Sequence, residues 1–221
     1  MPRKSTRNLR LRHALGDRGM GDDRWADLRC QVAYLAARLM AEGGITDYRV
    51  AKQKAARQAG LVDASALPDN REIEEALRVY QQLYQGVEQP AQLLWLRQRA
   101  VEVMRLLGKF NPHLVGAVLS GTANEFSEIE LHLYADDSKN VELFLIDHRI
   151  AYRAELYHPR LGDRVLNVPV LKIEFDGAPV SLAVYGIDDI RFARRGDERA
   201  LERAKLSEVE ALLATKRVRS T

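Results

Sequence analysis

The periodicity of the apolar residues changes once along this chain, at Asn111-Pro112, and that change constrains the fold most strongly. Before it, apolar residues recur at the spacing of amphipathic helices; after it, apolar and polar residues alternate as they do in strands. This order of elements predicts an α+β protein, in which a helical N-terminal region precedes a mixed β-sheet with flanking helices.

Local start signals define the helices expected before the change. Thr46 or Asp47 can cap a helix, Asp69 with Glu72 three residues later is a capping box, and Pro90 suits a first helical turn. The glycines Gly43-Gly44 end the first pattern. The expected helices cover residues 28–39, 49–57, 69–84 and 90–107.

Alternation with a period of two predicts the strands of the second half. Asp176-Gly177 is the expected turn of a hairpin, and Ser207 to Glu210 form a capping box for a last helix. We expect strands at residues 113–119, 127–134, 151–157, 167–175 and 179–185, and a short helix at 140–146. The expected organisation is a basic flexible arm (1–23), a helical region (24–89), an α/β core (90–189) and a charged linker with a C-terminal helix (190–221).

The composition excludes several classes of protein. No run approaches the roughly 18 apolar residues that cross a bilayer, so we expect no membrane partner. The single cysteine, Cys30, cannot form an internal disulfide, and a reducing cytoplasm is the simplest location. One cysteine and scattered histidines also exclude the usual zinc clusters.

The segment from Leu114 to Tyr134 carries the candidate chemistry. An apolar run ends in Ser120-Gly121-Thr122, and the next apolar run bears Glu128, Glu130 and His132 at every other position. Side chains at this spacing in a strand point to one face. The sequence therefore places two carboxylates side by side near a turn of small residues.

This segment resembles the nucleotidyltransferase superfamily, the polymerase-beta-type fold. Gly121-Thr122 stands at the family's small pair, and Ser127 to Leu131 is similar to its serine, acid, apolar, acid, apolar segment. The resemblance covers about residues 90–189 and extends to a bacterial group of nucleotidyltransferase-like proteins with similar helices ahead of the core.

The resemblance implies transfer of a nucleotidyl group from a nucleoside triphosphate. It implies that Glu128 and Glu130 hold Mg²⁺, because carboxylate-bound metal can bridge phosphates. It also implies that the backbone and hydroxyl groups of Ser120, Gly121 and Thr122 hold the triphosphate. Nucleotide binding with degenerate catalysis is the alternative within the family.

The third acid of the family has no direct counterpart here. Ser181 stands where that carboxylate is expected, and Glu174 on the preceding strand is the best candidate for the role. Both acids of the first pair are glutamates, whereas the family favours aspartates. A solvated strand face is the other interpretation of Glu128, Glu130 and His132.

Basic residues before the core suggest a second, non-enzymatic function. Such groups contact RNA or DNA phosphates, although a solubilising arm and a solvated helix face have the same composition. Helix 49–59 with its flanking glycines resembles a helix-turn-helix layout, so a nucleic-acid-binding or adaptor protein is the alternative. The candidate residues are Arg3, Lys4, Arg7, Arg10 and Arg12 in the arm, and Arg49, Lys52 and Arg57 in the helix.

Overall fold

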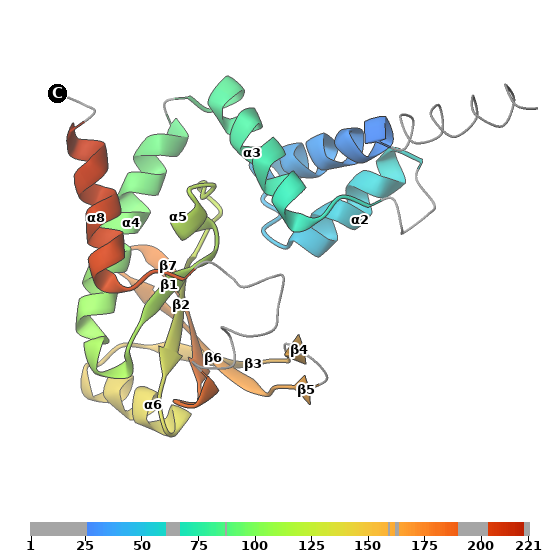
Figure 1. The fold of residues 1–221 in the computed structure, drawn as a ribbon. Coiled ribbons are helices and arrows are strands. Elements are labelled where there is room, and N and C mark those ends of the chain that lie inside the picture. Colours follow the sequence, from blue (N-terminus) through green and yellow to red (C-terminus); the bar gives the residue numbers. More distant parts are fainter. Residues whose placement is uncertain are drawn as a thin grey trace, which may run out of the picture. The chain divides into compact units, whose positions relative to one another are not determined.

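The computed structural model describes residues 26–60, 67–86, 88–158, 160–161, 164–189 and 203–218 (Figure 1). The protein has the α+β fold that the sequence predicts, with helices before a mixed sheet. It divides into two compact units, the first ending at Tyr84 and the second beginning at Gln85. The predicted basic arm, residues 1–23, lies outside the described residues.

Small residues fill the core of the first unit. Its described helices are residues 26–43, α2 (Tyr48–Gln58) and α3 (Asn70–Tyr84). Ala36, Ala51 and Ala55 have no exposed surface, and they pack in one cluster with Ile73 and Leu77. Because an alanine side chain is short and loses no rotamer freedom on burial, the helices can approach closely at little entropic cost.

The predicted caps of α2 and α3 are confirmed. The Asp47 carboxylate accepts hydrogen bonds from the backbone N–H groups of Arg49 and Val50, at 2.7 and 3.2 Å. At α3, the Asp69 carboxylate accepts from the Glu72 N–H at 2.8 Å, while the Glu72 carboxylate accepts from the Asp69 N–H at 2.6 Å. This reciprocal pair satisfies N–H groups that the first helical turn leaves without partners.

The second unit begins with its longest helix and ends with a helix. None of the described helices is both long and apolar enough to span a membrane. The helices are α4 (Glu88–Leu106), the 3₁₀ helix η2 (Gly108–Phe110), α5 (Gly116–Ser120), α6 (Ser138–Asp147) and α8 (Leu206–Val218). Pro90 lies in the first turn of α4, as predicted.

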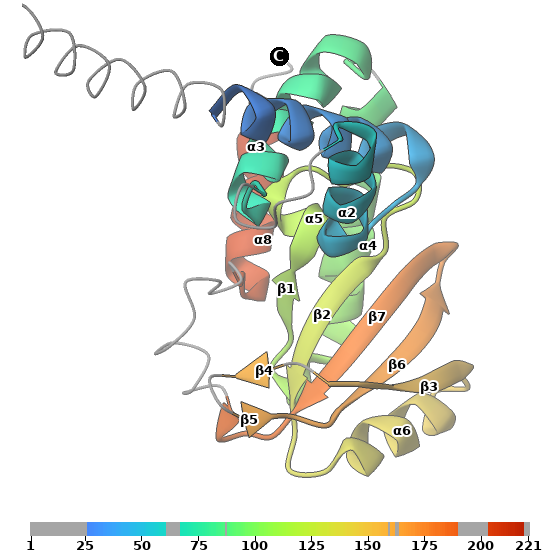
Figure 2. The ribbon, with the colours of Figure 1, turned by 90° about the vertical axis from the view of Figure 1, so that its right-hand side faces the viewer.

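A five-stranded sheet in the order β1-β2-β7-β6-β3 forms the centre of this unit (Figure 2). Strand β2 runs parallel to β7, and the other neighbours are antiparallel. A separate small hairpin joins β4 to β5. The strands are β1 (His113–Val115), β2 (Ile129–Tyr134), β3 (Tyr152–Tyr157), β4 (Arg160–Leu161), β5 (Arg164–Val165), β6 (Val168–Phe175) and β7 (Ala178–Tyr185).

One face of the sheet forms the main core. Ile129, Leu131 and Leu133 of β2 have no exposed surface, and they pack in one cluster with residues of α4, α6 and α8. Figure 1 shows these helices on the same side of the sheet. Glu130 and His132, at alternate positions of the same strand, lie on the opposite face and are partly buried.

Two local predictions differ from the structure. Residues 113–119 were expected to be a strand, but β1 ends at Val115 and residues 116–120 form α5. The last helix begins at Leu206 rather than after Ser207, and the Glu208 carboxylate accepts from the Lys205 N–H at 2.6 Å. The predicted hairpin turn is confirmed: Asp176 and Gly177 both have positive φ, at 50° and 78°, as a type I′ turn requires.

Candidate functional site

Three polar residues lie side by side across the face opposite the core. Glu130 of β2 is aligned with Ser181 of β7, and Ser181 is aligned with Lys172 of β6. Residues directly opposite one another on neighbouring strands point to the same face. Glu128 precedes Glu130 by two residues and extends the same face just before β2 begins.

Lys172 forms an ion pair with the first carboxylate. Its Nζ lies 2.6 Å from Oε1 and 2.8 Å from Oε2 of Glu128, so both carboxylate oxygens accept from one ammonium group. About a third of each side chain is exposed, 33% for Lys172 and 35% for Glu128, so water screens the pair. Pairs of this kind contribute about 1 kcal/mol or less to stability. The pair matters more for charge than for stability, because it brings the positive charge of Lys172 from β6 to the carboxylate that precedes β2.

Glu130 is more deeply placed than Glu128. Burial raises the pKa of its carboxyl group, and the Glu128 carboxylate raises it further, while Lys172 lowers it. The carboxylate lies directly over Gly116, the first residue of α5. A Cβ atom on Gly116 would come within 2.3 Å of Oε1 of Glu130, and the φ angle of this glycine is +69°. Only glycine fits here without moving the carboxylate.

The turn Ser120-Gly121-Thr122 closes α5 and does not open a helix. The backbone N–H groups of Gly121, Thr122 and Ala123 all donate to the carbonyl oxygen of Ala117, at 3.0 to 3.1 Å. Gly121 is the C-cap of α5, with φ of 92°. These three N–H groups are therefore engaged within the turn, and a phosphate at this position would have to compete with a backbone carbonyl.

The hydroxyl groups of the turn contact each other. Ser120 Oγ and Thr122 Oγ1 are 3.0 Å apart, and Thr122 is almost fully buried. The small pair that directly follows the first strand is instead Gly116-Ala117, which the sequence interpretation missed. A glycine after two apolar strand residues was the available signal, but the unbroken apolar run through Leu119 obscured it.

Side chains of helix α4 donate hydrogen bonds to the backbone of α5 and of the turn that follows it. The buried Arg97 guanidinium donates to the carbonyl oxygens of Val118 and Leu119, both at 2.9 Å. Gln89 Nε2 donates to the carbonyl oxygens of Gly121 and Ala123, at 3.0 and 2.8 Å. Desolvation lowers the pKa of Arg97. Carbonyl groups at the end of a short helix lack intrahelical partners, and these side chains supply them.

Glu174 does not join the pair formed by Glu128 and Glu130. It is exposed, and it is aligned with Pro179 of β7, so β7 separates it from β2. Within the described ranges, no group of three or more His, Cys, Asp or Glu residues could hold a metal ion. Mg²⁺ prefers several hard oxygen ligands, and both Glu128 oxygens already accept from Lys172. The carboxylates as arranged do not fit a Mg²⁺ site.

Aromatic rings and histidines continue this face toward the ends of β2 and β7. The ring of His132 lies 4.7 Å from that of Tyr185, and His113 lies 5.4 Å from Tyr134. Burial lowers the pKa of His132 to about 4, with Arg203 and His113 as further causes. Burial also raises the pKa of Tyr185 to about 12. Both groups are therefore neutral at neutral pH.

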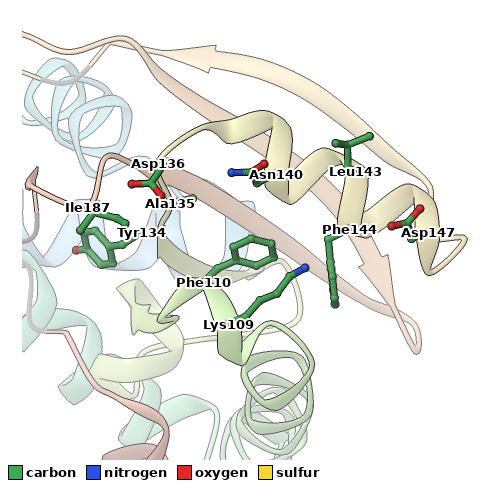
Figure 3. Close-up of a pocket in the computed structure, with 10 residues that line it drawn as sticks. All are labelled: Lys109, Phe110, Tyr134, Ala135, Asp136, Asn140, Leu143, Phe144, Asp147 and Ile187. Carbon is green, nitrogen blue, oxygen red and sulfur yellow. The ribbon is translucent and has the colours of Figure 1, made fainter.

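A pocket of about 440 Å³ lies away from the carboxylates (Figure 3). It lies between η2, the end of β2 and α6, and none of the predicted site residues lines it. Lys109 Nζ lies 4.3 Å from the ring centre of Phe144 and 4.8 Å from that of Phe110, so a cation of the chain already covers the aromatic wall. Asp136 and Asp147 contribute carboxylates to the lining.

Helix α2 presents its basic residues away from its buried side. Ala51, Ala55 and Ala56 face the core, whereas Arg49 and Arg57 are exposed and Lys52 is partly exposed. The helix contains no acidic residue. The exposed side of α2 is therefore positively charged.

Comparison with known proteins gives distant structural matches. No family model and no curated protein matches the sequence. Cid1 in complex with the UTP analogue UMPNPP is 15% identical, with a TM-score of 0.35, over 55% of this chain and 39% of that chain. A cytoplasmic RNA terminal U-transferase is 14% identical, with a TM-score of 0.34, over 53% and 36% of the two chains.

A third match, the Cid1 poly(U) polymerase bound to MgATP, is 14% identical with a TM-score of 0.35, over 57% of this chain and 41% of that chain. The matched region thus spans about two fifths of these solved chains. At these identities and TM-scores, the function of this chain must be inferred from its own residues.

Proposed function

We propose that the protein is nucleotidyltransferase-like, and that it binds a nucleotide on the face of Glu128, Glu130 and Lys172 without metal-dependent transfer. The ion pair between Lys172 and both oxygens of Glu128 carries this proposal. In metal-dependent phosphoryl transfer, carboxylate-bound cations neutralise the phosphates. Here the ammonium group of Lys172, rather than a metal ion, lies beside the Glu128 carboxylate.

The residue of β7 that is aligned with Glu130 supports the proposed loss of nucleotidyl transfer. Ser181 lies directly beside Glu130, where the family resemblance implies a third carboxylate. A serine hydroxyl can accept a hydrogen bond but carries no charge to hold a divalent cation. Glu174 is aligned with Pro179 rather than with Ser181, so the groups gathered around Ser181 are the carboxylates of Glu128 and Glu130 and the ammonium group of Lys172.

The same residues support binding of phosphate groups. Lys172 can exchange its carboxylate partner for a phosphate, because an exposed ion pair of this strength costs little to open. Arg153 is aligned with Lys172 on the neighbouring strand, and 83% of its side chain is exposed. The two cations lie on one face, and burial together with the Glu128 carboxylate raises the pKa of Glu130 beside them.

Calorimetric titration with ATP, GTP and CTP, each with Mg²⁺ and with EDTA, tests this proposal. We expect binding in both conditions, with affinities within a few fold of each other, and no pyrophosphate release. Lys172→Met should weaken binding at least about tenfold, the effect of removing one charge-assisted hydrogen bond. Lys139→Met, an exposed lysine on α6, is the matched control. Absence of nucleotide binding in all conditions, or binding that requires Mg²⁺, would contradict the proposal.

The charged side of α2 supports a second function, contact with RNA or DNA. Arg49 and Arg57 are exposed on a helix that has no acidic residue, and Lys52 lies partly exposed between them. Basic groups so placed bind phosphates through counterion release. The predicted arm carries further basic residues, from Arg3 to Arg12, that could contact phosphates.

Binding to single-stranded RNA and duplex DNA at several salt concentrations tests this second function. Arg49→Ala with Arg57→Ala should weaken binding and reduce the slope of log K against log salt by roughly 1 for each arginine that no longer reaches a phosphate. Arg71→Ala, an exposed arginine on α3, is the matched control. Removal of residues 1–12 is a separate variant. Binding with an unchanged salt slope in every variant would exclude this role.

A further inference from the structure

The two edge strands of the main sheet, β1 and β3, differ in whether another segment pairs with their outer side. At the β1 edge, the Leu114 N–H donates to the Ala204 carbonyl at 2.8 Å, and the Ala204 N–H donates to the Leu114 carbonyl at 3.0 Å. The backbone at Ala204 therefore pairs with the outer side of β1. At the other edge, β3 pairs with β6 on one side, and no strand of the described residues pairs with its outer side.

Apart from its two charged residues, Arg153 and Glu155, strand β3 lacks the features that usually prevent edge pairing. It pairs with β6 over six consecutive residues without a bulge, from Tyr152 opposite Ile173 to Tyr157 opposite Val168. It contains no proline, glycine or lysine. Natural edge strands are commonly blunted by such residues, by bulges, or by a covering segment. A long, regular and exposed edge of this kind is a template for another strand.

The exposed residues of β3 also include apolar ones. Leu156 is 57% exposed and Tyr157 is 55% exposed. Ala154, at the middle of the strand, is exposed as well and has a small side chain that allows close approach of another backbone. Burial of these groups on pairing would add a hydrophobic contribution to the backbone hydrogen bonds.

We propose that β3 pairs with β3 of a second copy of this chain, antiparallel and centred on Ala154. In that register Arg153 lies opposite Glu155 of the second copy, and Glu155 lies opposite its Arg153. Tyr152 and Leu156 are then opposite each other on the other face, so both charged groups and both apolar groups find complementary partners. The two sheets become one continuous sheet.

The charges of β3 select this register over its neighbours. In a dimer with a two-fold axis, the same face of each sheet lies on the same side of the joined sheet. The axis must then pass beside a residue of β3 that lies opposite its own copy, so alternative registers are centred on neighbouring residues. Centring on Arg153 would place this arginine opposite itself, and centring on Glu155 would do the same for the glutamate. Like charges directly opposite one another destabilise strand pairing. Within one chain the two side chains are only loosely paired, with Nε and Oε1 3.7 Å apart.

Sedimentation velocity over a concentration series, on the full chain, tests the charge pattern. We expect a dimer for the natural sequence. Arg153→Glu alone or Glu155→Arg alone should weaken dimerisation roughly tenfold or more, because each places like charges in two cross-strand positions. The combined swap, Arg153→Glu with Glu155→Arg, should restore it. Lys139→Glu on α6 is the control for charge reversal elsewhere.

Disulfide trapping tests the register independently of any effect on stability. In a Cys30→Ser background, Ala154→Cys should form a disulfide between copies under mild oxidation. Opposed residues in antiparallel strands have Cα atoms about 4.5 to 5.5 Å apart, within the disulfide range of about 4.4 to 6.8 Å. Leu156→Cys should not, because its counterpart lies several residues away along the paired strands. A monomer at all concentrations, single reversals without effect, or equal trapping at both positions would overturn the proposal.

Discussion

Lys172 Nζ lies between the two carboxylate oxygens of Glu128, at 2.6 and 2.8 Å, although the residues are 44 positions apart in the sequence. The contact joins β6 to the segment that leads into β2, with β7 between them. It places a positive charge beside the carboxylates on which the resemblance to nucleotidyltransferases depends. The proposed loss of metal dependence follows from this relationship.

Replacement of Gly116 should destabilise the protein through both the backbone and Glu130. In Gly116→Ala, a residue with a side chain must adopt a φ near +69°, and its Cβ would lie 2.3 Å from Glu130 Oε1. The backbone cost alone is about 1 to 2 kcal/mol. We expect urea denaturation to show at least this loss. Gly108→Ala, whose Cβ would meet no atom within 4 Å, should change stability much less.

Combining Gly116→Ala with Glu130→Ala separates the two causes. Shortening Glu130 removes the carboxylate that the new Cβ would approach, so only the backbone cost should remain. The double variant should then lose less stability than the sum of the two single variants. Additive losses would show that the carboxylate does not press on Gly116.

Removal of the Arg97 guanidinium should loosen the turn that ends α5. Arg97→Met keeps much of the side-chain volume but leaves the Val118 and Leu119 carbonyl oxygens without their donor. An unsatisfied buried polar group costs about 1 to 3 kcal/mol. We expect faster hydrogen exchange at residues 116–123 and a lower free energy of unfolding. Arg105→Met, which removes an exposed partner of Glu210, should leave exchange in that segment unchanged.

Acid should destabilise the protein through His132. The pKa of this ring is lowered from 6.5 to about 4, so between these values the unfolded chain binds a proton that the folded protein does not. The free energy of unfolding therefore falls as the pH is lowered through this window, by up to about 3 kcal/mol. His132→Gln should reduce the slope of stability against pH between pH 4 and 6.5.

The exposed His148 provides the comparison for this pH effect. His148→Gln should leave the slope of stability against pH as in the natural protein. If His132→Gln also leaves the slope unchanged, the ring is protonated in the folded protein at pH values well above 4, and its burial has no effect on acid stability.

Local signals in the sequence predicted most of the elements. Asp47, the Asp69–Glu72 box and the Asp176-Gly177 turn act through residues at most three positions apart, so their structures follow from the local sequence. The α+β class follows from the change of periodicity at Asn111-Pro112. Helix α5 was missed because five residues of an apolar run have too few turns to show a helical period.

The site was predictable only in part. The common face of Glu128 and Glu130 follows from their spacing, but Lys172 and Ser181 reach it through strand pairing over long distances in the sequence. No local pattern specifies that β2 lies parallel to β7 or that β6 follows next in the sheet. Likewise, the engagement of the Gly121 and Thr122 N–H groups depends on α5, which the sequence did not reveal.

Direct titration of Mn²⁺, followed by electron paramagnetic resonance, tests most simply whether Lys172 replaces a metal ion. We expect no stoichiometric Mn²⁺ site in the natural protein. In Lys172→Met, Glu128 and Glu130 lose their cation, and we expect Mn²⁺ to bind at least about tenfold more tightly, because a divalent ion would relieve the repulsion between the carboxylates. Adding Glu128→Gln should abolish that gain, and Lys139→Met should show none. Equally tight, stoichiometric Mn²⁺ binding by the natural protein and by Lys172→Met would contradict the account.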